Sequence, residues 1–323
     1  MQSDIMFSII IALYNKSDYI EKAIQSILKQ TYNRFEVIVV NDGSSDDGPN
    51  KVKQYTDPRI QIIFQPNSGV SIARNNGMKA AKYDYIAFLD ADDWWDIHFL
   101  EEMKRLIEDY PDAGIYGSKY YWVKNGSNKG FENNEPDCFR GYIDYIKAYT
   151  YSWWMPLTSI SVVIPKYIFN KTGGFKSQLK FGEDFDLWIR IALNHKIAYV
   201  NKYLSYYNQD VPVLNRALGS RKLYHPGNHF IFNLDYLDVN EKTNPELKTL
   251  LDGLRVRALQ QYHLSGMYPS EVRRLLNKVD FNQQPFYYRF FYRTPKPFVK
   301  LFCFVRIRGS RIKQYLLNSI KTS

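Results

Sequence analysis

Four short apolar segments, alternating with segments of helical periodicity, constrain the fold of this chain more than any other feature. The apolar segments are rich in Ile, Val and Phe, which is typical of strands that are buried on both faces. They cover residues 7–14, 35–40, 60–65 and 83–89, and helical periodicity fits residues 16–30, 71–81 and 96–109. This alternation predicts an α/β fold with a parallel sheet and helices on both of its faces.

The first helical segment has the periodicity of a helix with one buried face. Apolar side chains recur three or four residues apart between Tyr19 and Leu28. Ser17 is suited to cap the N-terminus of this helix. Asp18 would lie in the first turn, where the helix dipole favours a negative charge.

Polar sequence follows three of the predicted strands. The first strand is followed by YNK, the second by NDGSSDDG and the fourth by DADDWWD. The carboxyl ends of parallel strands meet at one edge of a sheet, and ligands bind beyond that edge. The sequence therefore predicts a single site that is built from these three turns.

Asp90 and Asp92 are the residues of this site that best suit a metal ion. One residue separates them at a strand end, so both side chains can face one ligand while Ala91 points away. A small number of carboxylate oxygens suits Mg²⁺ or Mn²⁺ that is held jointly with substrate phosphates. The alternative is a solvated acidic turn in which Asp93 or Asp96 caps the next helix.

The turn after the first strand excludes two common nucleotide-binding motifs. ALYNKSDYI contains no glycine, whereas dinucleotide-binding and P-loop folds need glycine-rich turns at this point. A nucleotide would instead rely on side chains: Tyr14 is able to stack on a base, and Asp42 is able to accept a hydrogen bond from a base N–H such as that of uracil. Each also has a structural interpretation, Tyr14 as part of the core and Asp42 as a turn residue.

A second acidic pair, Glu183 and Asp184, stands at the predicted start of a helix in LKFGEDFDLWIRIALNH. Leu187, Trp188 and Ile191 give this helix an apolar stripe. The helix dipole alone favours acidic residues in a first turn. A carboxylate that is held at a rigid helix start is also well placed to act as a general base.

Three sequence blocks together resemble the family 2 glycosyltransferases. They are FSIIIALYNKSDYIEKAIQSILKQTYNRFEVIVVNDGSSDDG, NSGVSIARNNGMKAAKYDYIAFLDADDWW and FGEDFDLWIRIA. The resemblance runs from about Ile5 to Tyr207. It implies the GT-A (Rossmann-like) fold, with a mixed and mostly parallel sheet, and inverting transfer from a nucleotide-sugar. Ala12 stands where members usually carry proline, a departure that removes no functional side chain.

Position by position, the resemblance implies how a donor is held. Tyr14 and Asp42 would hold a uracil-type base, and Ala12 would contribute its backbone. Arg74 matches an arginine that contacts the nucleotide, and Asp90 would contact the ribose.

The remaining matches concern the reaction itself. Asp92 would bind the Mg²⁺ or Mn²⁺ ion that bridges the diphosphate, and Asp184 would be the catalytic base, with Glu183 as the less favoured choice. The metal would stabilise the departing diphosphate, and the base would remove the proton of the acceptor hydroxyl. A single direct displacement inverts the anomeric carbon.

The expected activity is transfer of a sugar from a UDP-sugar to a hydroxyl of a saccharide or lipid-linked acceptor, in the synthesis of a cell-surface polysaccharide or glycan. Two alternatives are a sugar nucleotidyltransferase and a catalytically inactive subunit that binds nucleotide-sugars. The glycine-free first turn counts against the first, and the presence of Asp90, Asp92 and Asp184 counts against the second.

The C-terminal part of the chain differs from the rest in composition. We expect a catalytic domain over residues 1–215 and a helical region over residues 216–323 that ends in a basic, aromatic tail. The net charge is +10, and nine Lys or Arg but no Asp or Glu lie between Phe281 and Ser323. The preceding residues are therefore nearly neutral. This tail predicts peripheral attachment to an anionic membrane surface through residues 286–317.

Single-stranded nucleic acid and a purely structural role are the alternatives for the tail, although a sugar-transfer site gives nucleic acid no purpose. The two cysteines have neither disulfide nor metal-site spacing, and no apolar run is long enough to span a membrane. Residues 5–13 follow Asp4 and lack a small-residue cleavage site, which predicts a strand rather than a signal peptide. The expected location is the cytoplasm, with attachment to the inner face of the cell membrane.

Overall fold

The computed structural model describes residues 4–131, 135–212 and 222–299. The chain divides into two compact units, residues 1–234 and 235–323. The domain boundary that we expected near residue 215 lies outside the described residues, within 213–221.

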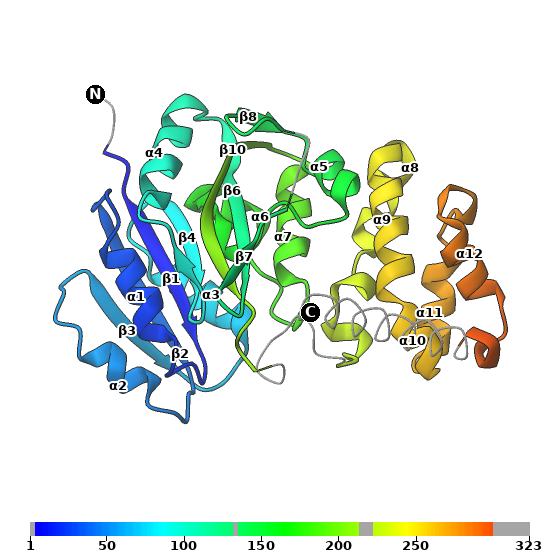
Figure 1. Cartoon of the computed structure of the whole chain (residues 1–323), viewed down its shortest axis with the longest axis horizontal. Helices are drawn as coiled ribbons and strands as arrows, with labels where there is room; N and C mark the ends of the chain where they lie inside the picture. Colours follow the sequence, from blue (N-terminus) through cyan, green and yellow to red (C-terminus); the bar gives the residue numbers. More distant parts are fainter. Residues whose placement is uncertain (1–3, 132–134, 213–221, 300–323) are drawn as a thin grey trace, which may run out of the picture. The chain divides into compact units, whose positions relative to one another are not determined.

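Ten strands of the described residues form one sheet in the N-terminal unit (Figure 1). Its order is β3-β2-β1-β4-β9-β6-β10-β5, with β7 beside β6 and β8 beside β10. The strands are β1 (Phe7–Leu13), β2 (Phe35–Asp42), β3 (Ile60–Gln65), β4 (Tyr85–Asp90), β5 (Trp94–Trp95), β6 (Ala113–Lys124), β7 (Ser127–Lys129), β8 (Arg140–Ile143), β9 (Val162–Pro165) and β10 (Lys196–Asn208). The pairs β1/β2, β1/β4, β2/β3 and β6/β10 are parallel, whereas β5, β7, β8 and β9 pair antiparallel.

Helices cover both faces of this sheet. They are α1 (Ile20–Leu28), α2 (Gly48–Lys53), α3 (Val70–Ala80), α4 (Phe99–Asp109), α5 (Tyr145–Ser152), α6 (Lys166–Thr172) and α7 (Glu183–Ala192), with 3-10 turns η1 (Ser159–Ser161), η3 (Pro226–Asn228) and η4 (Phe230–Phe232). Alternate residues of β1 face opposite ways. Ile9 and Ile11 pack in one cluster with α1 and α4, whereas Ile10 lies so close to Gly77 of α3 that a Cβ there would approach within 2.5 Å. The predicted α/β fold, a mixed and mostly parallel sheet flanked by helices, is confirmed.

Helix α1 begins two residues later than the predicted cap at Ser17 implies. Its first residue is Ile20, no side chain caps it, and Glu21 is the acidic residue of its first turn. The prediction that Ser17 caps this helix and that Asp18 lies in its first turn is therefore wrong. The backbone N–H of Ser17 instead donates to Asp46 Oδ2 at 2.7 Å, which ties residue 17 to the turn after β2.

The C-terminal unit is helical, as the sequence predicts. Its elements are α8 (Asp238–Thr243), α9 (Pro245–Ala258), α10 (Gln260–Ser265), α11 (Pro269–Leu276) and α12 (Phe286–Arg293), with 3-10 turns η5 (Asp235–Leu237) and η6 (Phe281–Gln283). Helix α9 has Pro245 in its first turn, and Asn244 caps it by accepting from the backbone N–H groups of Glu246 and Leu247, an arrangement that favours a helix start. None of the helices in the described ranges is long and apolar enough to cross a bilayer.

An ion network is buried between α8 and α9. Arg255 donates to both carboxylate oxygens of Glu241, at 2.5 and 2.7 Å, and to Asp252 at 3.1 Å. Lys248 Nζ pairs with Asp252 at 2.6 Å. Because a buried charge without its partner is costly, this network favours a single packing of the two helices.

Candidate active site

A cavity of about 570 Å³ lies beyond the carboxyl ends of β1, β2 and β4. Its volume lies within the range of small-molecule sites, roughly 300–1,000 Å³. Most of the predicted site residues line it, namely Ala12, Tyr14, Asp42, Arg74, Asp90, Asp92 and Glu183. Asp184, the predicted catalytic base, is the neighbour of Glu183 but is not among the lining residues.

The turns after β1 and β2 are hydrogen-bonded to each other. Asn15 adopts a left-handed conformation with φ 51°, which Asn tolerates better than most residues and which allows the turn to form without glycine. The backbone N–H of Asn15 donates to Ser44 Oγ at 3.1 Å, and Asn15 Oδ1 accepts from the backbone N–H of Ser45 at 2.8 Å. Together with the bond between Ser17 and Asp46, these contacts join the two turns, and the neighbouring residues Tyr14 and Asp42 form one wall of the cavity.

Tyr14 and Asp42 lie on this wall in different surroundings. Tyr14 is 48% exposed, so its ring is available to a planar ligand. Asp42 is buried: its Oδ1 accepts from Gln65 Nε2 at 2.7 Å and from the backbone N–H of Ser68 at 2.8 Å, and its Oδ2 accepts from the backbone N–H of Gly69 at 2.8 Å. A carboxylate oxygen accepts about two hydrogen bonds, so Oδ2 retains capacity for one more donor.

Arg74 of α3 connects the two acidic groups of the site. Its Nη2 donates to Asp90 Oδ1 at 2.5 Å and to Ser159 Oγ at 3.1 Å, and its Nη1 donates to Glu183 Oε1 at 2.9 Å. Burial opposes the charge of Arg74, but Asp90 and Glu183 outweigh this effect and raise its pKa. The end of β4 and the start of α7 are thus held by one guanidinium.

The acidic residues after β4 are largely withdrawn from solvent. Asp92 Oδ2 accepts from Lys16 Nζ at 2.6 Å, and Asp93 Oδ1 accepts from the backbone N–H of Asn208, at the end of β10, at 2.7 Å. Burial raises the pKa of Asp92 against the effect of Lys16. Burial and the charges of Asp92 and Asp90 raise the pKa of Asp93 well above its usual value.

The structural alternative for these acids, in which Asp93 or Asp96 caps the next helix, is not observed. Helix α4 begins at Phe99, and no side chain caps it. Asp96 Oδ1 accepts from the backbone N–H of His98 at 2.9 Å, within the turn before the helix.

The carboxylates of this segment fit a divalent cation that is shared with a phosphate ligand. In the parts of the chain that the structure describes, no group of three or more His, Cys, Asp or Glu side chains is arranged to enclose a metal alone. Asp90 and Asp92 offer hard oxygen ligands on the cavity wall, and Asp93 Oδ2 is buried without a hydrogen-bond partner among the described residues. Magnesium is commonly held by one or two carboxylates together with substrate phosphates and water. The donor set therefore suits a shared ion rather than a complete protein cage.

Helix α7 carries the second acidic pair in its first turn, directly after Gly182. Asp184 Oδ1 accepts from the backbone N–H of Phe185 at 2.7 Å. Burial raises the pKa of Asp184 to about 7, and the charge of Glu183 adds to this rise while Arg74 opposes it. The carboxyl group of Asp184 is therefore suited to take up and release a proton near neutral pH.

Gly182→Ala is expected to destabilise the N-terminal unit and to displace the acids of α7. A Cβ at residue 182 would lie 2.2 Å from the ring of Phe230, and the φ of 75° is one that residues with side chains rarely adopt. We expect the free energy of unfolding, measured by denaturant titration, to fall by about 2–4 kcal/mol. Gly173→Ala is the control, since Gly173 has φ 86° but nothing within 4 Å of an added Cβ, and it should cost about 1–2 kcal/mol. Equal losses in the two variants would contradict the close approach to Phe230.

Three lysines on the cavity wall were not predicted from the sequence. Lys16, Lys180 and Lys222 line the cavity together with Arg74. Lys16 could have been found from the sequence, because the segment YNK follows a predicted strand at the edge where ligands bind. Lys180 and Lys222 lie far along the chain from the strand ends, and only the fold brings them to the site. Several cations around one cavity suit a phosphate-bearing ligand.

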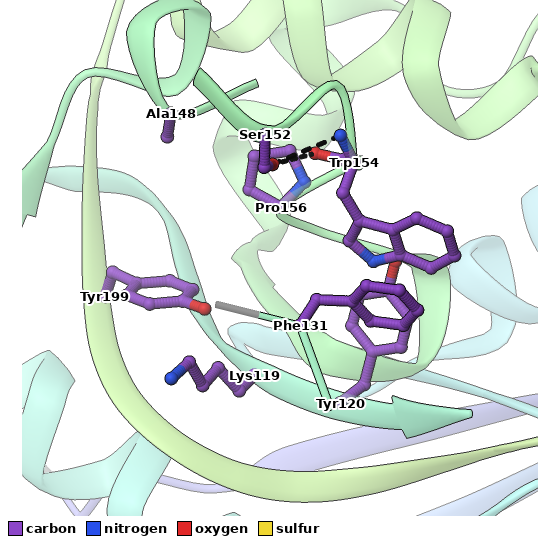
Figure 2. Close-up of a pocket in the computed structure, with 8 residues that line it drawn as sticks. All are labelled: Lys119, Tyr120, Phe131, Ala148, Ser152, Trp154, Pro156 and Tyr199. Carbon is purple, nitrogen blue, oxygen red and sulfur yellow. Dashed lines mark hydrogen bonds between the residues drawn. The ribbon is translucent and has the colours of Figure 1, made fainter. Parts of the chain in front are cut away.

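A second cavity, lined by residues of β6, β10 and α5 and by neighbouring loops, is much smaller (Figure 2). Its volume of about 30 Å³ holds about one or two water molecules. The Trp154 ring stacks on Phe131 with centroids 3.5 Å apart, and Figure 2 shows Lys119 and Tyr199 across the cavity from them. A nucleotide or a sugar ring does not fit in this space, so the larger cavity is the candidate substrate site.

Sequence comparison matches the region that builds this site. The model of a family described as Glycosyl transferase family 2 matches residues 8–179, a span that runs from the second residue of β1 past α6 and ends before α7. EpsH of Bacillus subtilis strain 168, which is named as a glycosyltransferase, is 39% identical over 110 residues, or 33% of this chain and 32% of that protein. The glycosyltransferase GlyA of Streptococcus pneumoniae serotype 4 is 37% identical over 123 residues, or 38% of this chain and 18% of that protein. The matches thus span about a third or less of the length of these two relatives.

A solved structure shares the fold of this chain. S. aureus TarS, residues 1–349, in complex with UDP-GlcNAc, superimposes with a TM-score of 0.66 at 19% sequence identity. The match covers 85% of this chain and 79% of that chain. The likeness indicates that this chain has the same GT-A arrangement of sheet and helices.

Proposed function

The chain belongs to glycosyl transferase family 2, and on that premise we propose that it transfers a sugar from a UDP-sugar to a hydroxyl of a saccharide or lipid-linked acceptor, with inversion at the anomeric carbon. One observation carries this proposal. Arg74 binds Asp90 at the end of β4 and Glu183 at the start of α7, so the carboxylates after β4 and the first turn of α7, which also carries Asp184, border one cavity. Direct displacement needs both groups in fixed positions on opposite sides of the reacting carbon. We place the reaction in the synthesis of a cell-surface polysaccharide or glycan.

The nucleobase would bind on the wall that the first two turns form. The half-exposed ring of Tyr14 offers a stacking surface, and Asp42 Oδ2 has capacity to accept the N–H of a uracil-type base. The backbone at Ala12 lies on the same wall. The TarS structure, which contains UDP-GlcNAc, supports a uridine nucleotide as the donor of a protein with this fold.

The diphosphate would lie between the acids after β4 and the lysines of the cavity. Asp92, together with Asp90, would hold a Mg²⁺ or Mn²⁺ ion, which when bound stabilises negative charge on the leaving diphosphate. Lys16, Lys180 and Lys222 line the same cavity. Their positive charges would also stabilise the negative charge of the diphosphate. Lys16 Nζ contacts Asp92 at 2.6 Å, so it lies where a phosphate bound beside Asp92 would also be within its reach.

Asp184 is the group that we propose as the general base. Glu183 forms an ion pair with Arg74 at 2.9 Å, which favours its charged, deprotonated form. The pKa of Asp184 is raised to about 7, which suits proton uptake near neutral pH. Asp184 would remove the proton of the acceptor hydroxyl while that oxygen attacks the anomeric carbon opposite the diphosphate. A single displacement of this kind inverts the configuration.

Binding of UDP tests the donor half of this proposal. Isothermal titration is expected to detect UDP binding that strengthens when Mn²⁺ or Mg²⁺ is added, because an ion held by Asp92 would offset the negative charge of the phosphates. Absence of binding at millimolar UDP, with and without the ion, would refute the assignment of the cavity.

Turnover separates the proposal from its two alternatives. Release of the nucleoside diphosphate is measured with UDP-glucose, UDP-galactose and their N-acetyl forms. GDP-mannose serves as the control for the choice of nucleobase. A glycosyltransferase releases UDP from at least one of these donors. A nucleotidyltransferase instead releases pyrophosphate from UTP and a sugar phosphate, and an inactive subunit binds UDP without turnover of any donor.

The activity is expected to rise with pH and to be half-maximal near pH 7. Below its pKa of about 7, Asp184 is protonated and is unable to accept the proton of the acceptor hydroxyl, so kcat/KM falls as the pH is lowered. Above about pH 8 the carboxylate is fully formed, and this limb of the profile should be flat. The measurement is kcat/KM for the best donor between pH 5 and 9. A profile that is flat between pH 5 and 8 would contradict a base with this pKa.

A further inference from the structure

Helix α12 carries aromatic and basic side chains in alternation along one face. Phe286, Arg289, Phe290 and Arg293 are spaced i, i+3, i+4 and i+7, which places them on one face of the helix; we call this face the α12 stripe. Phe286 is 73% exposed and Phe290 is 37% exposed. The stripe thus combines uncovered apolar area with positive charge.

The opposite face of α12 fixes the helix to its own unit. Phe291 is buried, and its ring lies 5.9 Å from that of His263 in α10. Tyr292 Oη donates to the backbone carbonyl of Val256 in α9 at 2.8 Å. The orientation of the stripe is therefore set by packing within residues 235–299. Phe298, which is 65% exposed, follows the helix and adds apolar surface.

The cations of this region have no carboxylate partners, in contrast to those that precede it. Within the described residues, no Asp or Glu lies within 4.0 Å of Arg289, Arg293 or Lys296, whereas Arg274 and Lys278 pair with Asp235 and Asp238 at 2.6–2.9 Å. The sequence after residue 280 contains no acidic residue at all. The positive charge at α12 therefore has no carboxylate of the described residues to neutralise it; Arg293 and Lys296 are exposed, and Arg289 is partly buried.

We propose that the α12 stripe, with Phe298 and Lys296, docks on the surface of a membrane that contains anionic lipid. Aromatic side chains gain burial at the boundary between headgroups and acyl chains, and cations near an anionic leaflet gain attraction to the headgroups. A second copy of the chain is a poor partner, because self-contact of the stripe would bring like charges together with no acid between them. The sequence-based prediction placed attachment in residues 286–317, of which 300–323 lie outside the described residues.

Vesicle flotation of the full-length chain tests this surface. The wild type is expected to float with vesicles of phosphatidylglycerol and phosphatidylcholine at low salt, and to bind less to phosphatidylcholine alone or at high salt. Arg289→Gln with Arg293→Gln should weaken partitioning by about 25-fold, at about fivefold for each cation. Phe286→Ser with Phe290→Ser should weaken it by more than about tenfold. Phe286→Leu with Phe290→Leu keeps the apolar area and should stay within about fivefold of the wild type.

Two matched controls remove the same chemistry elsewhere. Lys29→Gln with Lys242→Gln removes two exposed cations, and Phe64→Ser with Tyr167→Ser removes two exposed aromatic rings; both pairs should float as the wild type does. Thermal unfolding of each variant shows whether it is folded, and the Leu pair separates loss of membrane binding from loss of structure.

Several results would overturn the proposal. They are a wild type that does not float, stripe variants that float as well as the wild type, and equal binding to vesicles with and without phosphatidylglycerol. If a single-stranded oligonucleotide displaced the wild type from vesicles at a concentration lower than that of the anionic lipid, the stripe would be assigned to nucleic acid instead. Dimerisation that depends on the stripe, measured by size exclusion, would assign it to a second copy.

Discussion

Asp184→Asn is expected to lower kcat about a thousandfold while the affinity for UDP stays within about twofold of the wild type. Asn has nearly the shape of Asp and keeps an oxygen that accepts from the backbone N–H of Phe185, which now bonds Asp184 at 2.7 Å. It has no carboxylate to take a proton. Because the proton leaves the acceptor hydroxyl only as the reaction proceeds, the loss falls on turnover rather than on donor binding. UDP release and isothermal titration of UDP measure the two quantities separately.

Glu183→Gln is the matched control for this variant. Glu183 bonds Arg74 at 2.9 Å, and its charge contributes to the raised pKa of Asp184. Its removal should leave turnover within about tenfold of the wild type and move the acid limb of the pH profile to lower pH. The pKa of Asp184 should fall because the negative charge of Glu183 no longer raises it. The Arg74 guanidinium, which lowers this pKa, would also lose one of its carboxylate partners. A thousandfold loss in Glu183→Gln alone would show that Glu183 is the base.

Asp92→Asn is expected to reduce metal-dependent turnover by about a thousandfold or more. Asp92 lies on the cavity wall, and Asn keeps an oxygen that is able to accept from Lys16, so the variant should fold, with some loss of stability from the weakened ion pair. Loss of the carboxylate charge removes the main protein ligand that we propose for the ion. UDP affinity should therefore no longer increase when Mn²⁺ is added. Turnover and UDP titration across a range of Mn²⁺ concentrations measure both effects.

Asp96→Asn is the control within the same acidic segment. Asp96 accepts from the backbone N–H of His98 at 2.9 Å and does not line the cavity. We expect this variant to keep both its turnover and its dependence on Mn²⁺. Full activity in Asp92→Asn would refute the assignment of Asp92 as a metal ligand. If Asp96→Asn lost as much turnover as Asp92→Asn, the effect would be attributed to a disturbed turn.

The strands that lie beside one another in the parallel half of the sheet were the easiest part of the fold to predict. The segment predicted at 60–65 coincides with β3, and β1 ends one residue before the predicted end of its segment. These strands are short and the central ones are covered by helices on both faces, so their sequences are almost continuously apolar. Burial on both faces is therefore visible in the sequence itself.

Strand β10 shows why the other half of the sheet was missed. Its 13 residues, KIAYVNKYLSYYN, combine charged, aromatic and apolar side chains. Its register against β6 shifts between Val200 and Tyr203 and again before Ser205, and each shift interrupts the alternation that marks a strand. Strand β5 has only two residues, too few to show any period.

The position of the site was predictable, whereas its electrostatics were not. Parallel strand ends placed the turns that carry Tyr14, Asp42 and Asp90 at one edge without further information. The pairing of Lys16 with Asp92 joins residues 76 positions apart, and no local pattern indicates it. The pKa of Asp184 is raised by burial and by Glu183 against the effect of Arg74, and only the folded chain brings these groups together.

The hydrogen bonds that Asn15 makes with Ser44 and Ser45 bear on how nucleotide preference is able to change in this chain. The wall on which we propose that the nucleobase binds is built from two separate stretches of sequence, which these bonds join. Exchanging the first turn for that of a relative would leave Ser44 and Ser45 without their partners, and exchanging the second would leave Asn15 without its own. A graft that aims at guanine or thymine donors therefore has to carry both turns together, and inheritance of a new preference would require the two stretches to change as a pair.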